Sequence, residues 1–262
     1  MTYVNGPRAV DNEKVGLAPL LQMSQQESGA SRAAAVSYGL MTGSRPNQAV
    51  PPDGLTGLVF VHGHLWWLGP QTRPWRPELS GVEVIGMRIA LQWGHAVLGE
   101  SLHAYRDARI PVDELWPSDS ALEALSGPLD EVPLNRLMRA LHHRIIEKTV
   151  DPFTENMAAL IRTGDFTVAD LAHRSELSVR QFHRRCLTSF GLAPSTLLRI
   201  NRLHQAAASV RRDGNTGLSG LAVSTGYFDQ AHLCREVRQL VGDPVSKAFA
   251  VASNVRFVQY PR

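Results

Sequence analysis

The amino-acid sequence predicts an α+β protein in which a β-rich N-terminal domain, cupin-like or related, precedes an all-helical domain. Short, partly alternating apolar runs interrupted by Gly and Pro fill residues 55–91, whereas helical periodicity dominates from residue 113 onward. At 262 residues the chain is long enough to bury two cores. We expect a β-rich domain at 1–125, a helical linker at 126–150 and a helical domain at 151–262.

The charge divides at the same place. Residues 1–150 carry 13 Lys and Arg against 15 Asp and Glu, a net charge of −2. Residues 151–262 carry 14 against 9, a net charge of +5. Basic charge gathered in one domain is typical of a nucleic-acid partner.

The sulfur content and hydropathy exclude several classes of protein. Two cysteines, Cys186 and Cys234, are too few for a disulfide framework or a multi-cysteine metal site, which suits a reducing cytoplasm. No apolar run approaches the ~20 residues that span a bilayer, and residues 1–30 lack the pattern of a secretory leader. We expect a soluble cytoplasmic protein with no membrane partner.

In the N-terminal part, three apolar runs predict strands at 58–61, 65–68 and 82–91. Residues 61–65, Val-His-Gly-His-Leu, predict a hairpin turn in which Gly63 is free to take a positive φ. The pair His62 and His64 also fits a cupin-type metal site, but no third ligand lies at a convincing distance, so we expect a polar turn and no metal.

The linker is predicted to be an amphipathic helix. Its apolar residues follow i, i+3, i+4, i+7 and i+11 spacing, which places Leu134, Leu137, Met138, Leu141 and Ile145 on one face. Such a helix can join the domains, pair two subunits, or pack on its own domain. The sequence leaves these three roles open.

The helical domain contains two similar halves. In the first, residues 167–174 form a short helix and a second helix runs from an N-cap at Ser178 to about Ser189, where Gly191 and Pro194 stop it. In the second half, residues 218–225 form the short helix, Gly226 permits a tight turn, and Asp229 caps the next helix. Two helices joined by a tight turn form a helix-turn-helix unit, so we expect two of them.

The second helix of each half has one apolar and one polar face. In the first half Phe182 and Cys186 point inward, and in the second half Leu233, Val237 and Leu240 do so. The outward sets are Arg180, Gln181, His183 and Arg184 in the first half, and Gln230, Ala231, Arg235 and Arg238 in the second, with His232 at the edge. Arg matches guanine O6 and N7 in the major groove, and Gln matches adenine N6 and N7.

Residues 195–212 are predicted to be one helix that spaces the two halves. Its packing positions include Leu198, Leu203 and residues 206–208. Its cations are Arg199, Arg202, Arg211 and Arg212, of which we expect some to contact phosphates and the others to be solvated. Arg199 is the phosphate contact that we single out.

These residues resemble the AraC family of bacterial transcription regulators, whose DNA-binding domain has two helix-turn-helix units joined by a long helix. The resemblance covers residues 153–244 and is strongest at 226–235, Gly-Tyr-Phe-Asp-Gln-Ala-His-Leu-Cys-Arg. It implies a regulator that binds double-stranded DNA and RNA polymerase, with an N-terminal domain that senses a small molecule, mediates pairing of two subunits, or both. The base-reading positions it implies are Arg180, His183, Arg184, Gln230, Ala231, His232, Cys234 and Arg235.

The same residues allow other interpretations. Four tryptophans, Trp66, Trp67, Trp75 and Trp93, line either a ligand pocket or the core, and we expect the core for most. Cys186 is expected to be inert in the core, whereas Cys234 lies at a DNA-facing position open to oxidation.

A DNA-repair enzyme with a related DNA-binding unit is the alternative function, but it needs a nucleophilic Cys beside a zinc cluster, so we expect no enzyme and no cofactor. A module whose basic faces bind an acidic protein is a third option.

Overall fold

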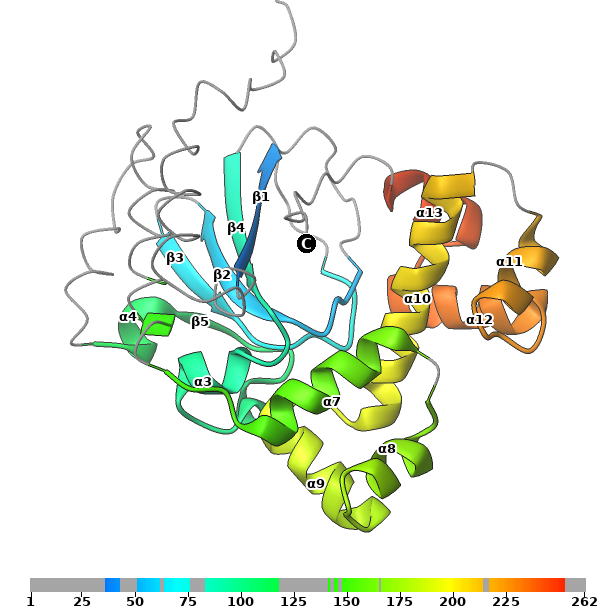
Figure 1. Ribbon diagram of the computed structural model, residues 1–262. Helices are drawn as coiled ribbons and strands as arrows, with labels where there is room; N and C mark the ends of the chain where they lie inside the picture. Colours follow the sequence, from blue (N-terminus) through cyan, green and yellow to red (C-terminus); the bar gives the residue numbers. More distant parts are fainter. Residues whose placement is uncertain are drawn as a thin grey trace, which may run out of the picture.

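The structure is a computed structural model that describes residues 36–42, 51–61, 64–75, 83–117, 141, 144–145, 148–164, 166–213 and 217–252. It has an antiparallel sheet in the N-terminal region and helices in the C-terminal region (Figure 1). The predicted α+β class is therefore confirmed.

The sheet contains the strands β1 (Val36–Thr42), β2 (Thr56–Val61), β3 (His64–Leu68), β4 (Glu83–Ile89) and β5 (Arg109–Pro111). Their order across the sheet is β1-β4-β2-β3-β5, and every neighbouring pair is antiparallel. The three predicted strands are present as β2, β3 and β4. Val61 pairs with His64, so the predicted hairpin is confirmed, while the conformation of Gly63 lies outside the described residues. The sequence patterns did not indicate β1 or β5.

One side of the sheet packs on short helices that follow β4 or β5 in the chain. These are α3 (Gly94–Leu98), the 3-10 helix η1 (Leu102–Tyr105) and α4 (Val112–Leu115). Trp67 and Trp93 are buried there, and Trp75 is buried in a separate cluster with Val59 and Leu68. Core packing is therefore confirmed for three of the four tryptophans, and Trp66 is half-buried. Of the predicted helix at 134–145 only Leu141, Arg144 and Ile145 are in described positions, and Leu141 and Ile145 join this core.

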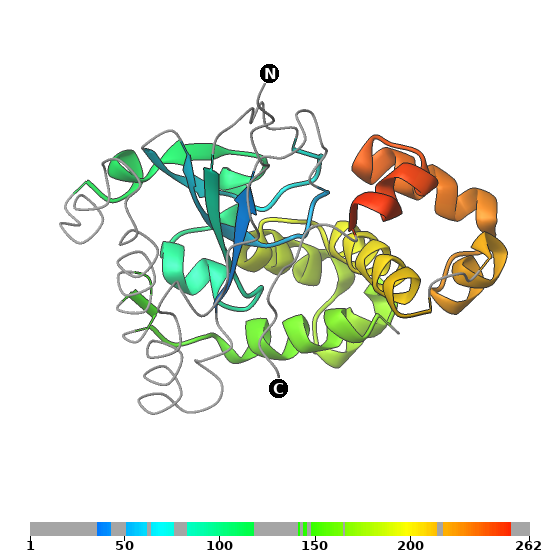
Figure 2. The same ribbon diagram turned by 90° about the horizontal axis from the view of Figure 1, so that it is seen from above.

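Seven helices are described in the C-terminal region. Their bounds are α7 (Pro152–Thr163), α8 (Val168–Arg174), α9 (Val179–Phe190), α10 (Pro194–Asp213), α11 (Leu218–Ser224), α12 (Gln230–Val241) and α13 (Val245–Ala252). The predicted helix ends are confirmed to within a residue or two. Buried residues of all seven helices belong to one continuous core. Figures 1 and 2 show α10 between the sheet and the pair α11 and α12.

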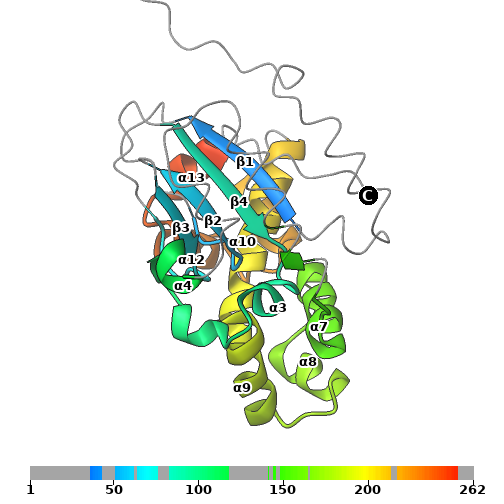
Figure 3. The ribbon, with the colours of Figure 1, turned by 90° about the vertical axis from the view of Figure 1, so that its left-hand side faces the viewer.

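The sheet region contacts the helices at several described positions. His204 Nε2 lies 2.9 Å from the carbonyl oxygen of Pro52. Gly54 faces Leu197 and Ile200 of α10, and Gly191, at the end of α9, lies against Pro70 and Leu102. Figures 1 and 3 show α3 and α9 next to each other at the lower end of the sheet. The helical region begins with Asp151 as the N-cap of α7, while most of the linker lies outside the described residues, so the domain boundaries stay a prediction.

The docking depends on a glycine. Gly191 has φ +73°, and a Cβ added there would lie 2.8 Å from the carbonyl oxygen of Leu102, whereas a Cβ added at Gly99, φ +85°, would meet nothing within 4 Å. We predict that Gly99→Ala lowers the free energy of unfolding by about 1–2 kcal/mol, the cost of a left-handed Ala. Gly191→Ala should cost clearly more, because it also separates the packed surfaces. Denaturant unfolding of the two variants measures the difference, and equal losses would contradict this contact.

Candidate nucleic-acid interface

The first helix-turn-helix unit consists of α8, a turn and α9. The turn contains Glu176, a non-glycine residue at φ +56°, and ends at Ser178, the N-cap of α9. Ser178 Oγ accepts a hydrogen bond from the Gln181 backbone N–H, and Gln181 Oε1 accepts one from the Ser178 N–H at 3.0 Å. This reciprocal capping fixes where α9 begins and therefore which of its residues face outward.

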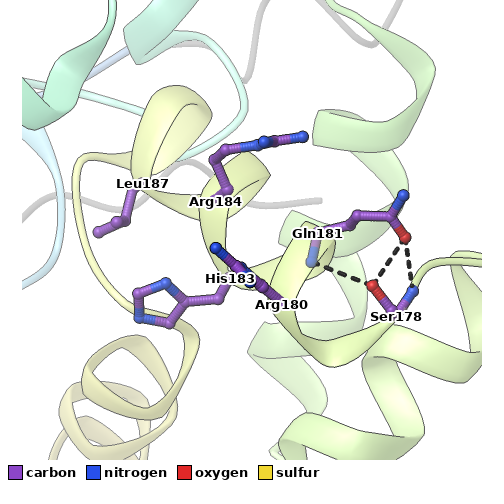
Figure 4. Close-up of a pocket in the computed structure, with 6 residues that line it drawn as sticks. All are labelled: Ser178, Arg180, Gln181, His183, Arg184 and Leu187. Carbon is purple, nitrogen blue, oxygen red and sulfur yellow. Dashed lines mark hydrogen bonds between the residues drawn. The ribbon is translucent and has the colours of Figure 1, made fainter.

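The outward face of α9 carries the predicted cationic set. Arg180, His183 and Arg184 are exposed, while Phe182 and Cys186 are buried. The residues of the outward face surround a hollow of about 570 Å³ (Figure 4). The lining residues are Ser178, Arg180, Gln181, His183, Arg184 and Leu187. The side chains needed for major-groove contacts are therefore together on one accessible surface.

The neighbouring arginine points the other way. Arg185 lies 4.1 Å from the centre of the Phe153 ring and forms an ion pair of 3.0 Å with Asp151. Burial opposes ionisation of Asp151, but hydrogen bonds from Arg185 and Thr154 outweigh it and lower the pKa of this carboxyl. Arg185 thus ties α9 to α7, which separates its role from that of Arg184.

Gln181 has a structural role in this conformation. The sequence predicts that it is one of the residues that read bases. Its Oε1 accepts hydrogen bonds from both the N–H and the Oγ of Ser178, as Figure 4 shows. Because adenine recognition needs that oxygen as an acceptor, Gln181 would have to break its capping bonds to read a base.

The second unit repeats this plan with α11 and α12. Gly226 has φ +75°, and the carboxylate of the N-cap Asp229 accepts a 2.6 Å hydrogen bond from the His232 N–H. The outward residues Ala231, Arg235 and Arg238 are exposed. Gln230 is exposed as well, and its Oε1 accepts a hydrogen bond of 3.0 Å from Ser219 Oγ on α11.

Two of the positions implied by the family resemblance are less open. His232 is half-buried, with its ring edge-on to Tyr227 and its Nδ1 accepting from the Phe228 N–H at 3.3 Å. Cys234 is half-buried and packs against the helical core. Cys186 is fully buried, and burial raises the pKa of its thiol to about 12, so the expectation of an inert thiol holds.

The helices α9 and α12 are equivalent residue by residue. Their N-caps, Ser178 and Asp229, and their C-caps, Gly191 and Gly242, all differ by 51 positions (229 − 178 = 51 and 242 − 191 = 51). The same offset pairs Arg184 with Arg235, and both are exposed. Two separate segments thus present a guanidinium at the same place on a capped helix.

Two of the predicted phosphate contacts on α10 have protein partners in this structure. Arg199 Nε donates to Glu236 Oε1 at 2.5 Å, and its Nη2 donates to Gln239 Oε1 at 2.8 Å. The Arg202 guanidinium lies 5.4 Å from the centre of the Tyr227 ring. Both side chains hold α10 against the second unit, because a cation beside a sparsely exposed carboxylate or an aromatic face is drawn inward. Arg212 is exposed, and the side chain of Arg211 is outside the described residues.

Two further expectations concern metal and membrane. His64 is exposed and His62 is not described. Within the described ranges, no group of three or more His, Cys, Asp or Glu residues is arranged to hold a metal ion. None of the helices in those ranges is long and apolar enough to cross a membrane.

Comparison with known proteins agrees with this geometry. Residues 171–250 match the family model of a helix-turn-helix domain, which spans both units from α8 into α13. This segment is an AraC-type helix-turn-helix domain, and the protein that carries it is a DNA-binding transcription regulator. No curated protein matches the chain.

Among solved structures, the chain is similar to ToxT from Vibrio cholerae. An apo form of a ToxT variant gives a TM-score of 0.46 at 10% identity, covering 82% of this chain and 96% of that chain. ToxT from strain O395 gives 0.46 at 10% identity, covering 84% and 98%. Wild-type ToxT bound to an unsaturated fatty acid gives 0.41 at 11% identity, covering 82% and 94%. At these scores the likeness supports no statement about a ligand.

The new role of Arg199 is testable through stability. We predict that Arg199→Ala lowers the free energy of unfolding by about 1–3 kcal/mol, because it leaves the carboxylate of Glu236 without its cation. The Glu236 side chain is only 10% exposed. Adding Glu236→Gln to this variant should restore part of the loss, and Arg212→Ala on the same helix should change stability by less than about 0.5 kcal/mol. Denaturant titration of the four proteins provides the measurement, and an unchanged Arg199→Ala would return this residue to the phosphate-contact role.

Proposed function

We propose that α9 and α12 are recognition helices that enter successive major grooves on one face of the duplex, so that one chain reads an asymmetric site. The observation that carries this proposal is the pair Arg184 and Arg235, exposed at equivalent positions of two capped helices. Each guanidinium is placed to donate two hydrogen bonds to guanine O6 and N7.

The length of the central helix supports the spacing. α10 has 20 residues, and at ~1.5 Å per residue it is about 30 Å long. Successive major grooves on one face of B-DNA lie about 34 Å apart. A helix of this length, packed against both units, suits two readers one turn of DNA apart.

The proposed contact residues follow from exposure and partners. The base-reading set is Arg180, His183, Arg184, Gln230, Ala231, Arg235 and Arg238, all of which are exposed. Gln181, His232 and Cys234 lie at the margins, since each has a capping or packing role in this conformation. Arg199 and Arg202 act by holding α10 to the second unit.

The proposal also includes three further partners: a small-molecule effector, RNA polymerase and a second copy of the chain. A small-molecule effector would act through the sheet region, because that region contacts the end of α9 and the face of α10 at Gly191 and His204. A ligand that favours one docking geometry would then change the placement of α9. RNA polymerase and a second copy of the chain are further partners, as is usual for regulators of the AraC type. Nothing in the described residues supports the DNA-repair alternative.

The first test removes one guanidinium at a time. On a site selected from random duplexes, Arg184→Ala and Arg235→Ala should each weaken binding by about 1–3 kcal/mol and relax the preference in one half of the site only. Arg73→Ala, which removes an exposed arginine from the sheet region, is the matched control and should bind like the parent. Titration against selected and random DNA measures both effects.

The salt dependence distinguishes DNA binding from a generic basic surface. The parent protein should bind random duplex DNA weakly, with an affinity that falls steeply as salt rises, because counterions are released from phosphates. If no duplex is selected over random sequence, the proposed function fails. If Arg184→Ala keeps both the affinity and the sequence preference, the orientation assigned to α9 is wrong.

A further inference from the structure

The outward faces of α9 and α12, which we call the reading faces, differ in chemistry although the two helices are equivalent. At the 51-residue offset, Arg180 corresponds to Ala231 and His183 to Cys234, while Arg184 corresponds to Arg235. The outward face of α9 is therefore rich in hydrogen-bond donors. The same positions on α12 hold one guanidinium beside apolar or weakly polar groups.

The turn before α12 is also one residue longer than the turn before α9. In the first unit the positive-φ residue Glu176 precedes the N-cap Ser178 by two positions, whereas in the second unit Gly226 precedes the N-cap Asp229 by three. The additional residue next to the N-cap is Phe228. Its side chain is 88% exposed.

This exposure is unusual for the position. A hydrophobic residue just before an N-cap commonly packs against the fourth residue of the helix. Leu177 of the first unit is half-buried and packs against the helical core in that way. In the second unit Tyr227 is buried instead, which leaves Phe228 outside the core at the end of α12 that enters the groove.

We propose that the second unit recognises the C5-methyl group of thymine through Phe228 and Ala231, whereas the first unit selects guanine through Arg180 and Arg184. An exposed phenyl ring beside an exposed alanine, at the N-terminal end of a recognition helix, offers an apolar contact to the one methyl group in the major groove. The inference rests on the proposed function. It assigns a thymine-containing half-site to α12 and a guanine-containing half-site to α9.

The test replaces thymine by deoxyuridine, which has the same pairing edge and lacks only the methyl group. The half-sites are assigned first, since Arg184→Ala relaxes the one read by α9 and Arg235→Ala the one read by α12. Deoxyuridine in the α12 half-site should weaken binding of the full-length protein by about 4-fold for each contacted methyl, the value of one buried methylene. Deoxyuridine in the α9 half-site should have no effect, whereas 7-deazaguanine there should weaken binding because it lacks N7.

Variants connect the effect to the side chain. Phe228→Ala should bind the thymine site more weakly and lose most of its ability to distinguish thymine from deoxyuridine. Because Phe228 is exposed, this variant should unfold at the same denaturant concentration as the parent. Val223→Ala removes exposed apolar surface from α11 and should retain the discrimination.

Three results would overturn the inference. The parent could bind deoxyuridine and thymine sites equally. Phe228→Ala could bind both sites as the parent does, with the same preference for thymine. Phe228→Ala could also weaken binding to both sites by the same factor, which would place the ring on the sugar-phosphate backbone. Each of these results is obtained with a duplex that the protein selects over random DNA. They are therefore distinct from failure of the proposed function, in which no duplex is selected.

Discussion

The packing of α10 is the constraint on which the rest of the helical region depends. This one helix contributes Leu197, Leu198, Ile200, Leu203 and Ala206 to a core shared by both helix-turn-helix units. A helix buried along so much of its length cannot tilt without opening that core, because interiors are close-packed. In this structure the distance and angle between α9 and α12 therefore depend on the apolar contacts of α10. The ion pair between Arg199 and Glu236 favours one rotation of α12 relative to α10.

The same packing divides the arginines into two groups. The net charge of the helical region is therefore larger than the positive charge that can contact DNA. Arg174 and Arg185 lie over the rings of Phe166 and Phe153, and Arg199 pairs with Glu236. The guanidiniums of Arg185 and Arg199 stabilise contacts between helices, and that of Arg174 holds Phe166 next to α8. Arg184 and Arg235 lie instead on the exposed faces of α9 and α12. A sequence carries the number of cations, but only the fold decides which of them find a carboxylate or an aromatic ring nearby.

Local signals explain most of what the sequence could predict. Caps such as Ser178 and Asp229, and glycines such as Gly191, act within one turn of their own helix, so helix ends and outward faces could be placed without a structure. The role of Arg199 depends on a carboxylate 37 residues away, which no local pattern indicates. The capping bond of Gln181 could be predicted from the sequence, because a Ser followed three positions later by Gln is a capping-box pattern. The strand β1 was missed because its pairing with β4 joins segments more than forty positions apart.

The placement of the sheet region has a consequence for control. Its contacts fall on Gly191 at the C-terminal end of α9 and on His204 of α10, whereas Arg180 and Arg184 lie nearer the N-terminal end of α9 and are exposed. Arg180 and Arg184 are therefore exposed while the two regions are docked. A change in this docking would act on the placement of α9 relative to α12, and so on the spacing that the two helices can match on DNA. Control by this route requires only that a ligand bind one docking geometry more tightly than another.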